Sequence, residues 1–305
     1  MRASPYYKQV ELLLRCIPEV NKETCFSLKG GTAINLFIRN FPRLSIDIDL
    51  AFLPLDPWET AIEQVEDSLL GISKNIRKSI KNAKVNESKN ATTKKVEKLF
   101  VSEQNAVIKI EPNPVIRGSV YKDRKLDLVK AASDVFGMEF SANVLSNADL
   151  YGGKIVAALD RQHPRDLFDA KLLLDNEGIS SEIRTAFLVY LASHARPMHE
   201  IIKPTLHDKK EEFEKEFVGM TNIAFSYEDF ESTRTKLIKT LSDQMTKEEK
   251  LFLVSIQNGK PDWDKLEIPQ LDALPALKWK VQNVQKMSKE KREAAIKQLK
   301  IKLGF

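Results

Sequence analysis

The fold is decided by residues 28 to 52, which read LKGGTAINLFIRNFPRLSIDIDLAF. A pair of glycines stands between the strand-like Phe26-Ser27-Leu28 and a helical pattern over residues 33–38, which ends at Asn40-Phe41-Pro42. Beyond the proline, apolar residues recur at every second position, which is typical of a strand with one buried face. The alternating residues are Leu44, Ile46, Ile48, Leu50 and Phe52. The segment therefore predicts a strand, a glycine turn, a helix and a second strand.

The polar face of the second predicted strand carries Ser45, Asp47 and Asp49. Two carboxylates two positions apart point the same way, and they lie roughly 7 Å apart along the backbone at ~3.3 Å per residue. They repel each other unless a cation neutralises them. Oxygen ligands of this kind suit Mg²⁺ (or Mn²⁺), which also binds substrate phosphates. Alone, an Asp-x-Asp pattern is more often an exposed polar strand face than a functional site.

Gly30-Gly31-Thr32 adds a second feature, because Thr32 lies fifteen residues before Asp47. Glycines between a strand and a helix let backbone N–H groups approach a phosphate, and the start of a helix favours negative charge. By itself a Gly-Gly pair is usually only a turn, and the spacing here is not that of a P-loop. The glycine turn, the helix and the acid pair together indicate a phosphate site much more specifically.

A third acid follows from a predicted hairpin over residues 96–101 and 106–111. Ile108 and Ile110 share one parity, which leaves Lys109 and Glu111 on the opposite face of the strand. Glu111 is a candidate third metal ligand beside Asp47 and Asp49. Asp127, in a short strand-like piece over residues 126–129, is the alternative; each acid taken alone is equally compatible with a solvated position.

The second half of the chain contributes Lys154, which follows Gly152-Gly153 in the early turns of a predicted helix. Glycine destabilises a helix interior by about 1 kcal/mol relative to alanine, so its use there indicates a close approach to something. Lys154 is then a candidate phosphate-binding point charge. Arg161, Arg165, Asp166 and Asp169 follow around the next helix start, where a carboxylate is also favourable for purely structural reasons.

Periodicity predicts an α+β chain of two parts. Residues 1–145 are expected to form a mixed α/β core with helices over 7–20 and 57–83 and a polar loop over 82–93. Residues 146–305 are expected to form an all-helical bundle, of which 146–176 complete the site.

The joint pattern resembles the AbiEii/MenT-type nucleotidyltransferase toxins, members of the polymerase-β-like nucleotidyltransferase superfamily. The resemblance rests on Leu28–Ala33, on Arg43–Leu50, on Lys154–Arg161 and on Arg165–Asp169, and it spans a little under half the chain. Gly30-Gly31-Thr32 replaces the Gly-Ser pair usual in the wider superfamily, a substitution typical of this branch.

The resemblance implies a polymerase-β-like nucleotidyltransferase domain followed by a helical bundle. It also implies a metal-dependent transfer of NMP from NTP to an acceptor such as the 3′ end of tRNA, with release of pyrophosphate, by the toxin of a type IV toxin–antitoxin or abortive-infection system. A cognate antitoxin protein is then an expected partner. By position, Asp47 and Asp49 hold the metal, and Lys154 and Asp166 complete the catalytic set, with Asp169 as the alternative to Asp166. Glu111 stays the candidate third metal ligand that strand parity indicates, with Asp127 as its alternative. The nucleotide-binding positions are Gly30, Gly31, Thr32, Ser45, Lys154 and Arg165.

Charge is unevenly distributed along the 305 residues. The net charge is +5, but residues 72–98 and 278–302 each carry +7, which leaves −9 for the remainder. Such a distribution indicates an anionic partner or two solvated helix faces. Lys/Arg supply most nucleic-acid affinity by neutralising phosphates, so both stretches are candidate RNA-binding surfaces, with 72–98 ranked first.

Several classes of protein are disfavoured by composition. No run of 18 apolar residues exists, and residues 1–8 lack the apolar core of a signal peptide, so a cytoplasmic protein without a membrane partner is expected. Cys16 and Cys25 are in no metal or redox spacing, and the four histidines are scattered, which disfavours a disulfide framework and a zinc site.

Two other functions remain open at this stage. The same chemistry could modify a hydroxyl of a protein or a small molecule. A non-catalytic nucleotide-binding module is disfavoured because it would have little reason to keep two repelling carboxylates on one strand face. The sequence does not distinguish which NTP is used, which acceptor receives the nucleotide, or the oligomeric state.

Overall fold

The computed structural model describes residues 4–305, and the chain divides into two compact units. The first unit extends to Ser146 and also takes in the later segment Val218–Ala224. The second unit comprises Asn147–Phe217 and Phe225–Phe305. Residues 1–3, the beginning of the stretch that lacks signal-peptide character, lie outside the described part.

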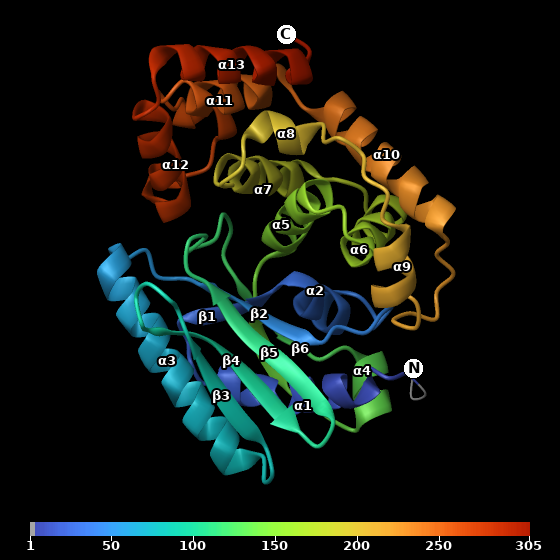
Figure 1. Ribbon diagram of the computed structural model, residues 1–305. Helices are drawn as coiled ribbons and strands as arrows, with labels where there is room; N and C mark the ends of the chain where they lie inside the picture. Colours follow the sequence, from blue (N-terminus) through green and yellow to red (C-terminus); the bar gives the residue numbers. More distant parts are fainter. Residues whose placement is uncertain (1–3) are drawn as a thin grey trace. The chain divides into compact units, whose positions relative to one another are not determined.

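The first unit is built on one mixed sheet with the strand order β3-β4-β5-β2-β1-β7-β6 among the described residues (Figure 1). The pairs β2/β5 and β1/β7 are parallel, and the other neighbours are antiparallel. The strands are β1 (Phe26–Lys29), β2 (Asp47–Phe52), β3 (Lys84–Lys89), β4 (Val96–Glu103), β5 (Ala106–Asn113), β6 (Arg124–Asp127) and β7 (Ser141–Val144). A mixed sheet combined with helices confirms the predicted α+β class.

Two helices of this unit, α1 and α3, pack on the apolar side of the sheet. α1 contacts β2 and β5, while α3 contacts β3 and β4. The strand residues at alternate positions under these helices are buried, which is the physical reason for the alternation in the sequence. They are Val85, Leu99, Val101, Ile108 and Ile110. The helices are α1 (Tyr7–Val20), α2 (Gly30–Ala33), the π-helix η1 (Ile34–Ile38), α3 (Trp58–Ser79) and α4 (Lys130–Phe136).

Two elements of the first unit differ from the sequence prediction. β2 begins at Asp47 rather than Leu44, because Arg43 forms a β-bridge with Thr221 and the Leu44 amide donates to the Met220 carbonyl at 2.7 Å. The polar loop predicted over residues 82–93 instead contains the edge strand β3, of which only Val85 is apolar and buried.

The second unit is helical throughout the part that the structure describes (Figure 1). α5 packs closely on α7, and Gly152 makes this possible, since a Cβ there would lie 2.7 Å from the Phe187 backbone nitrogen. The helices are α5 (Asn147–Asp160), α6 (Pro164–Asp175), α7 (Ser181–Ala192), α8 (Met198–Ile202), α9 (Lys210–Glu216), α10 (Tyr227–Gln244), α11 (Lys247–Gln257), η2 (Trp263–Leu266), η3 (Leu271–Ala273), α12 (Pro275–Gln285) and α13 (Lys289–Leu303). Over residues 4–305, none of the helices is both long enough and apolar enough to cross a membrane.

Candidate active site

Gly30 brings the backbone at the start of α2 against the acid pair. β1 ends at Lys29, and Gly30 turns the chain with a φ of +71°, a conformation that L side chains rarely adopt. A Cβ at Gly30 would lie 2.5 Å from Oδ2 of Asp49, which is closer than any stable contact. The glycine is therefore required both by the turn and by the carboxylate.

Gly31 is enclosed in a similar way by Arg43 and Ser45. A Cβ at Gly31 would lie 2.6 Å from Nη2 of Arg43 and 3.1 Å from Oγ of Ser45. Arg43 is buried, and its Nη1 donates to the carbonyl of Leu44 at 2.8 Å. The glycine turn is thus lined by a buried guanidinium, a positive charge that suits an anionic ligand.

Thr32 ties the glycine turn to the strand of the acid pair. Its hydroxyl donates to the backbone carbonyl of Asp47 at 2.5 Å and lies 3.0 Å from the hydroxyl of Ser45. Thr32 and Ser45 are both buried. These contacts hold the first residue of β2 in place relative to α2.

Asp47 and Asp49 lie on one face of β2, and both are half-buried. The strand register places Lys109 beside Asp47, and it places Lys29 and Glu111 on the two sides of Asp49. Burial lowers the pKa of Lys29, although Asp49 and Glu111 act in the opposite direction. Asp49 therefore lies between a lysine on β1 and a second acid on β5, while Asp47 lies beside a lysine on β5.

Glu111 is the candidate third acid that the structure brings beside Asp49. Its carboxylate accepts hydrogen bonds from Nζ of Lys109 at 2.7 Å and from Nζ of Lys98 at 3.1 Å. Burial acts to raise the pKa of Glu111, but the two lysines outweigh it and hold that pKa below its usual value. The carboxylate is consequently charged at neutral pH, and each of its oxygens is paired with a lysine.

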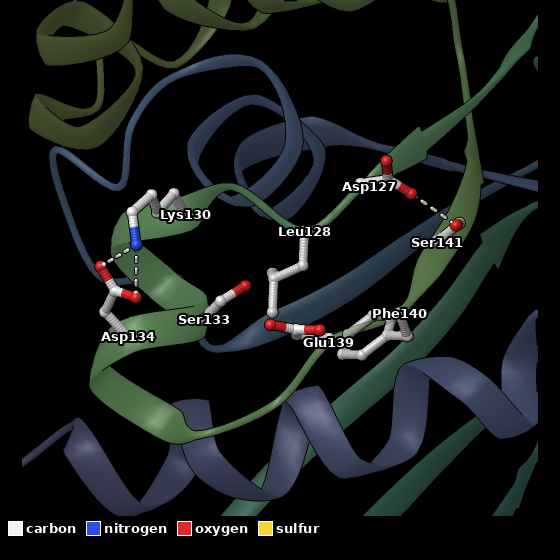
Figure 2. Close-up of a pocket in the computed structure, with 8 residues that line it drawn as sticks. All are labelled: Asp127, Leu128, Lys130, Ser133, Asp134, Glu139, Phe140 and Ser141. Carbon is white, nitrogen blue, oxygen red and sulfur yellow. Dashed lines mark hydrogen bonds and ion pairs between the residues drawn. The ribbon is translucent and has the colours of Figure 1, made fainter.

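Asp127, the alternative acid, belongs to another part of the sheet. It lies on β6, which is separated from β2 by β1 and β7, and it accepts a hydrogen bond from Ser141 at 2.6 Å. It lines a pocket of about 560 Å³ formed by β6, α4 and β7. Figure 2 shows the side chains that line this pocket. The other lining residues are Leu128, Lys130, Ser133, Asp134, Glu139, Phe140 and Ser141.

The residues around Asp49 fit a hard divalent cation, as judged by their chemistry. Mg²⁺ is commonly held by one or two carboxylates together with substrate phosphates and water, and it does not need a cage made only of protein ligands. Asp47 and Asp49 supply such carboxylates next to the glycine turn. Throughout residues 4–305, no three His, Cys, Asp or Glu side chains converge as a complete metal site.

The second unit holds Lys154 in a buried ionic cluster. Its Nζ lies 2.7 Å from Oδ1 of Asp166 and 3.0 Å from Oδ2 of Asp169, and Nε of Arg161 lies 2.6 Å from Oδ2 of Asp166. Lys154 is only 6% exposed and Asp166 only 1%. Burial acts to raise the pKa of Asp166, but Lys154 and Arg161 overcome it and lower that pKa well below its usual value.

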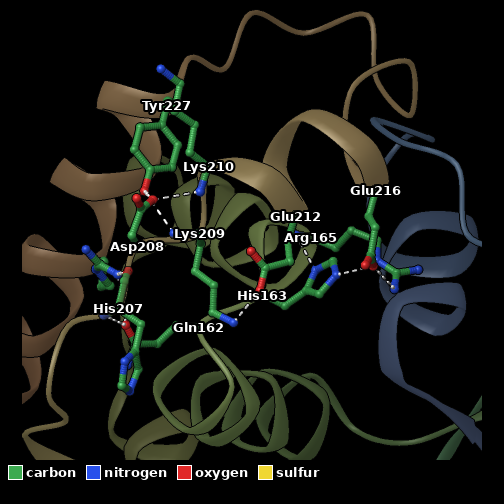
Figure 3. A network of polar contacts seen from close by, with 11 residues as sticks. Gln162, His163, Arg165, His207, Asp208, Lys209, Lys210, Glu212, Glu216 and Tyr227 are labelled. Atoms are coloured by element: carbon green, nitrogen blue, oxygen red, sulfur yellow. Dashed lines mark hydrogen bonds and ion pairs between the residues drawn. The ribbon is translucent and has the colours of Figure 1, made fainter.

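Arg165 lies in the first turn of α6, close to this cluster in sequence. His163 caps the helix, because its Nδ1 accepts the amide of Arg165 at 3.1 Å. The Nε2 of His163 lies 2.9 Å from Oε2 of Glu216, and Nη2 of Arg165 lies 4.0 Å from the same oxygen (Figure 3). The Arg165 guanidinium is therefore loosely paired at the surface, unlike the ammonium of Lys154.

A family of known proteins matches most of this sequence. The model of the nucleotidyl transferase AbiEii toxin family, from type IV toxin–antitoxin systems, matches residues 11–284. This chain belongs to the AbiEii family. It is accordingly a nucleotidyltransferase and the toxin of a type IV toxin–antitoxin system, which implies an NTP substrate and an antitoxin partner.

The fold of this AbiEii toxin is also found among solved structures. MenT4, a nucleotidyltransferase toxin from Mycobacterium tuberculosis H37Rv, superposes with a TM-score of 0.60 at 13% sequence identity. The match covers 95% of this chain and 92% of MenT4. No curated protein matches the chain.

The AbiEii toxin gathers most of the predicted site residues into two groups, one in each unit. The first group comprises Gly30, Gly31, Thr32, Ser45, Asp47, Asp49 and Glu111. The second comprises Lys154, Asp166 and Asp169, with Arg165 one residue before Asp166. Sequence reasoning assigned no role to Arg43, which only its position at the start of the acid-pair motif could have indicated. It included Lys98 in the basic stretch 72–98 but did not place it beside Glu111.

Proposed function

We propose that this AbiEii toxin transfers a nucleoside monophosphate from NTP to the 3′ end of tRNA in the cytoplasm, using Mg²⁺ (or Mn²⁺) held by Asp47 and Asp49. The observation that carries this proposal is the contact of Gly30 with Asp49. A glycine turn with only 2.5 Å between a would-be Cβ and a carboxylate oxygen brings phosphate-binding backbone and metal-binding acid to one place.

The chain's own residues would do the positioning that phosphoryl transfer needs. Backbone amides of Gly31 and Thr32 would face the triphosphate, and the buried Arg43 would add positive charge behind them. The divalent ion, when bound, would neutralise phosphate charge and favour an ionised acceptor hydroxyl. We assign Glu111, which pairs with Asp49 in the strand register, as a third ligand, and its carboxylate would have to leave Lys98 and Lys109 to reach the ion.

The proposed transfer requires no reactants other than NTP and the acceptor hydroxyl. The acceptor hydroxyl oxygen bonds to the α-phosphorus, and the bond from that phosphorus to the oxygen bridging to the β-phosphate breaks. Pyrophosphate leaves with the electron pair, and the hydroxyl proton passes to water. Because such transfer requires little covalent help from protein, orientation and charge neutralisation supply the catalysis.

Lys154 and Arg165 are assigned to phosphate contacts in this proposal. The ammonium of Lys154 already binds both Asp166 and Asp169, so a phosphate oxygen would take the place of one carboxylate rather than approach a free cation. Asp166, which also binds Arg161, is then assigned to keeping Lys154 in position.

A tRNA acceptor is supported by the distribution of charge. The exposed lysines of residues 72–98 extend over α3, β3 and β4 in the same unit as the acid pair. Transfer to a hydroxyl of a protein or small molecule is the second candidate. No observation in the structure favours a non-catalytic module.

The test is a labelled-NTP assay with total tRNA, one nucleotide at a time. We expect label in tRNA with Mg²⁺ and none with EDTA. Asp49→Asn should lower turnover at least about a hundredfold, because removing a charged group at the reacting phosphate removes transition-state stabilisation. Asp127→Asn, an acid on the same sheet but in the β6 pocket, should keep wild-type turnover. Full activity of Asp49→Asn would refute the assignment, and label in protein would redirect it to the second candidate.

A further inference from the structure

One face of β3, β4 and β5 is open beside the acid pair. α1 and α3 contact these strands through the buried positions, so the alternate positions point the other way. We call these alternate side chains the open face. They are Lys84, Asn86 and Ser88 on β3, Lys98, Phe100 and Ser102 on β4, and Val107, Lys109 and Glu111 on β5.

The strand register aligns the open face with the acid pair in two rows. The first row runs Asp47, Lys109, Phe100 and Asn86 across β2, β5, β4 and β3. The second row runs Asp49, Glu111, Lys98 and Ser88 in the same order. Neighbouring strands lie ~4.8 Å apart, so Phe100 lies roughly 10 Å from Asp47, a distance that one to two nucleotides span.

The open face combines an exposed aromatic ring with an excess of positive charge. Phe100 is 37% exposed, although a ring of this size would normally be buried. The open face carries three lysines and only one glutamate. One of these lysines, Lys84 on the edge strand β3, is exposed. A protein partner would favour a larger apolar centre, yet only Phe100 and Val107 are apolar here.

We propose that the open face binds the single-stranded 3′ end of the RNA acceptor. A base stacks on Phe100, and Lys109, Lys98 and Lys84 neutralise the backbone phosphates on either side. The terminal hydroxyl then lies at Asp47, at the end of the row. Stacking on an aromatic side chain of an open sheet, with lysines nearby, is a general mode of recognising single-stranded RNA. The inference rests on the proposed nucleotidyl transfer and adds the surface that presents the acceptor.

The experiment measures RNA binding separately from chemistry. A short fluorescein-labelled single-stranded RNA ending in CCA is titrated with the full chain without NTP, and KM for total tRNA is measured in the transfer assay. Phe100→Ala should raise both the Kd and the KM about 5-fold to 150-fold, the loss expected for one stacked base. Phe100→Tyr should restore binding, and NTP affinity should be unchanged. Lys84→Ala should lower the salt dependence of log Kd by about one unit of slope.

Matched controls lie away from the open face and outside both basic stretches. Leu70 is exposed on α3, which covers the other side of β3 and β4, and Lys125 is exposed on β6, the opposite edge strand of the sheet, so Leu70→Ala and Lys125→Ala should leave RNA affinity and salt slope as in the wild type. Wild-type RNA affinity of Phe100→Ala overturns the proposal, as does an equal loss in Leu70→Ala. If label enters a protein and Phe100→Ala lowers that transfer, the RNA assignment fails while nucleotidyl transfer stands. If Asp49→Asn retains turnover, the proposed function itself fails.

Discussion

At Gly30 the backbone lies so close to the Asp49 carboxylate that no space is left for a side chain. Its positive φ alone would exclude most side chains, and the 2.5 Å separation between a would-be Cβ and Oδ2 of Asp49 excludes even a methyl group. A substitution here must displace either α2 or the acid. A substitution at Gly30 should therefore lower the rate of the reaction more than it lowers the stability of the whole unit.

Gly30→Ala is expected to lower NTP turnover at least about tenfold, because the added methyl group pushes the Asp49 carboxylate from its position. The left-handed backbone conformation adds a stability cost of about 1–2 kcal/mol. Gly137→Ala is the matched control, since Gly137 has a φ of +65° and nothing within 4 Å of a Cβ. It should show the same loss of stability with full turnover. Equal turnover of the two variants would contradict this role for Gly30.

The positions of individual residues on the elements were predictable where they follow from period or spacing. The face shared by Asp47 and Asp49 follows from strand alternation, and Glu111 follows from the buried parity of Ile108 and Ile110. The position of Arg43 against Gly31 does not follow, because it depends on a tertiary approach between a turn and the chain before β2. The close approach predicted at Gly152 is present, but the sequence did not indicate that α7 is the element that approaches.

Among the elements, α5 and α6 are joined by charge as well as by apolar packing. Lys154 on α5 binds Asp166 and Asp169 on α6, and all three are almost inaccessible to water. A buried charge that loses its partner is far more costly than an exposed one. Lys154 consequently supports the helix pair, whatever it does for the nucleotide.

Lys154→Met should lower the free energy of unfolding by about 3–5 kcal/mol, since it leaves two carboxylates facing each other in a buried site. Chemical denaturation of the purified variant measures this loss. Lys171→Met, which removes an exposed i,i+4 pair with Asp175 on α6, should cost less than about 1 kcal/mol. Similar stability of both variants would show that the buried cluster contributes no more than a surface pair. Activity lost in Lys154→Met should be interpreted together with its stability.

Elements with strong apolar periods were predictable, and edge elements were not. α1 was predicted over Tyr7–Val20 and lies there, because its apolar residues recur with the helical period. β3 was predicted as a loop, since an edge strand needs only one buried side chain and its neighbours Asn86 and Ser88 face the open side. Main-chain pairing with β4 forms this strand, and main-chain pairing leaves no trace in side-chain periodicity.

On the scale of the whole molecule, the chain crosses between the two units more than once. Val218–Ala224 returns to the first unit, where Met220 accepts the Leu44 amide and the Thr221 hydroxyl donates to the Pro42 carbonyl at 2.8 Å. These bonds hold the residues that lead into β2. Nothing in the sequence of the segment indicates the pairing, because it consists of a single β-bridge and has no period.

Replacing Val218–Ala224 by a Gly-Ser linker of equal length should loosen the approach to the acid pair. We expect the Leu44 amide to exchange with solvent faster, and NTP turnover to fall several-fold, because the start of β2 loses its support. Hydrogen exchange followed by NMR measures this. The Leu53 amide, which donates to the Cys25 carbonyl at 2.9 Å at the other end of β2, is the internal reference and should stay protected. Unchanged exchange at Leu44 would show that the segment is dispensable.

The return of Val218–Ala224 also limits how such toxins can diversify. A single genetic crossover near residue 146 would join the first unit to a foreign helical half whose returning segment evolved against another partner. A functional exchange of one unit would need compatible crossover points near residues 146, 217 and 225 at the same time. Acceptor preference should therefore change among relatives by substitution in place, with both halves inherited together, and not by the shuffling of interchangeable modules.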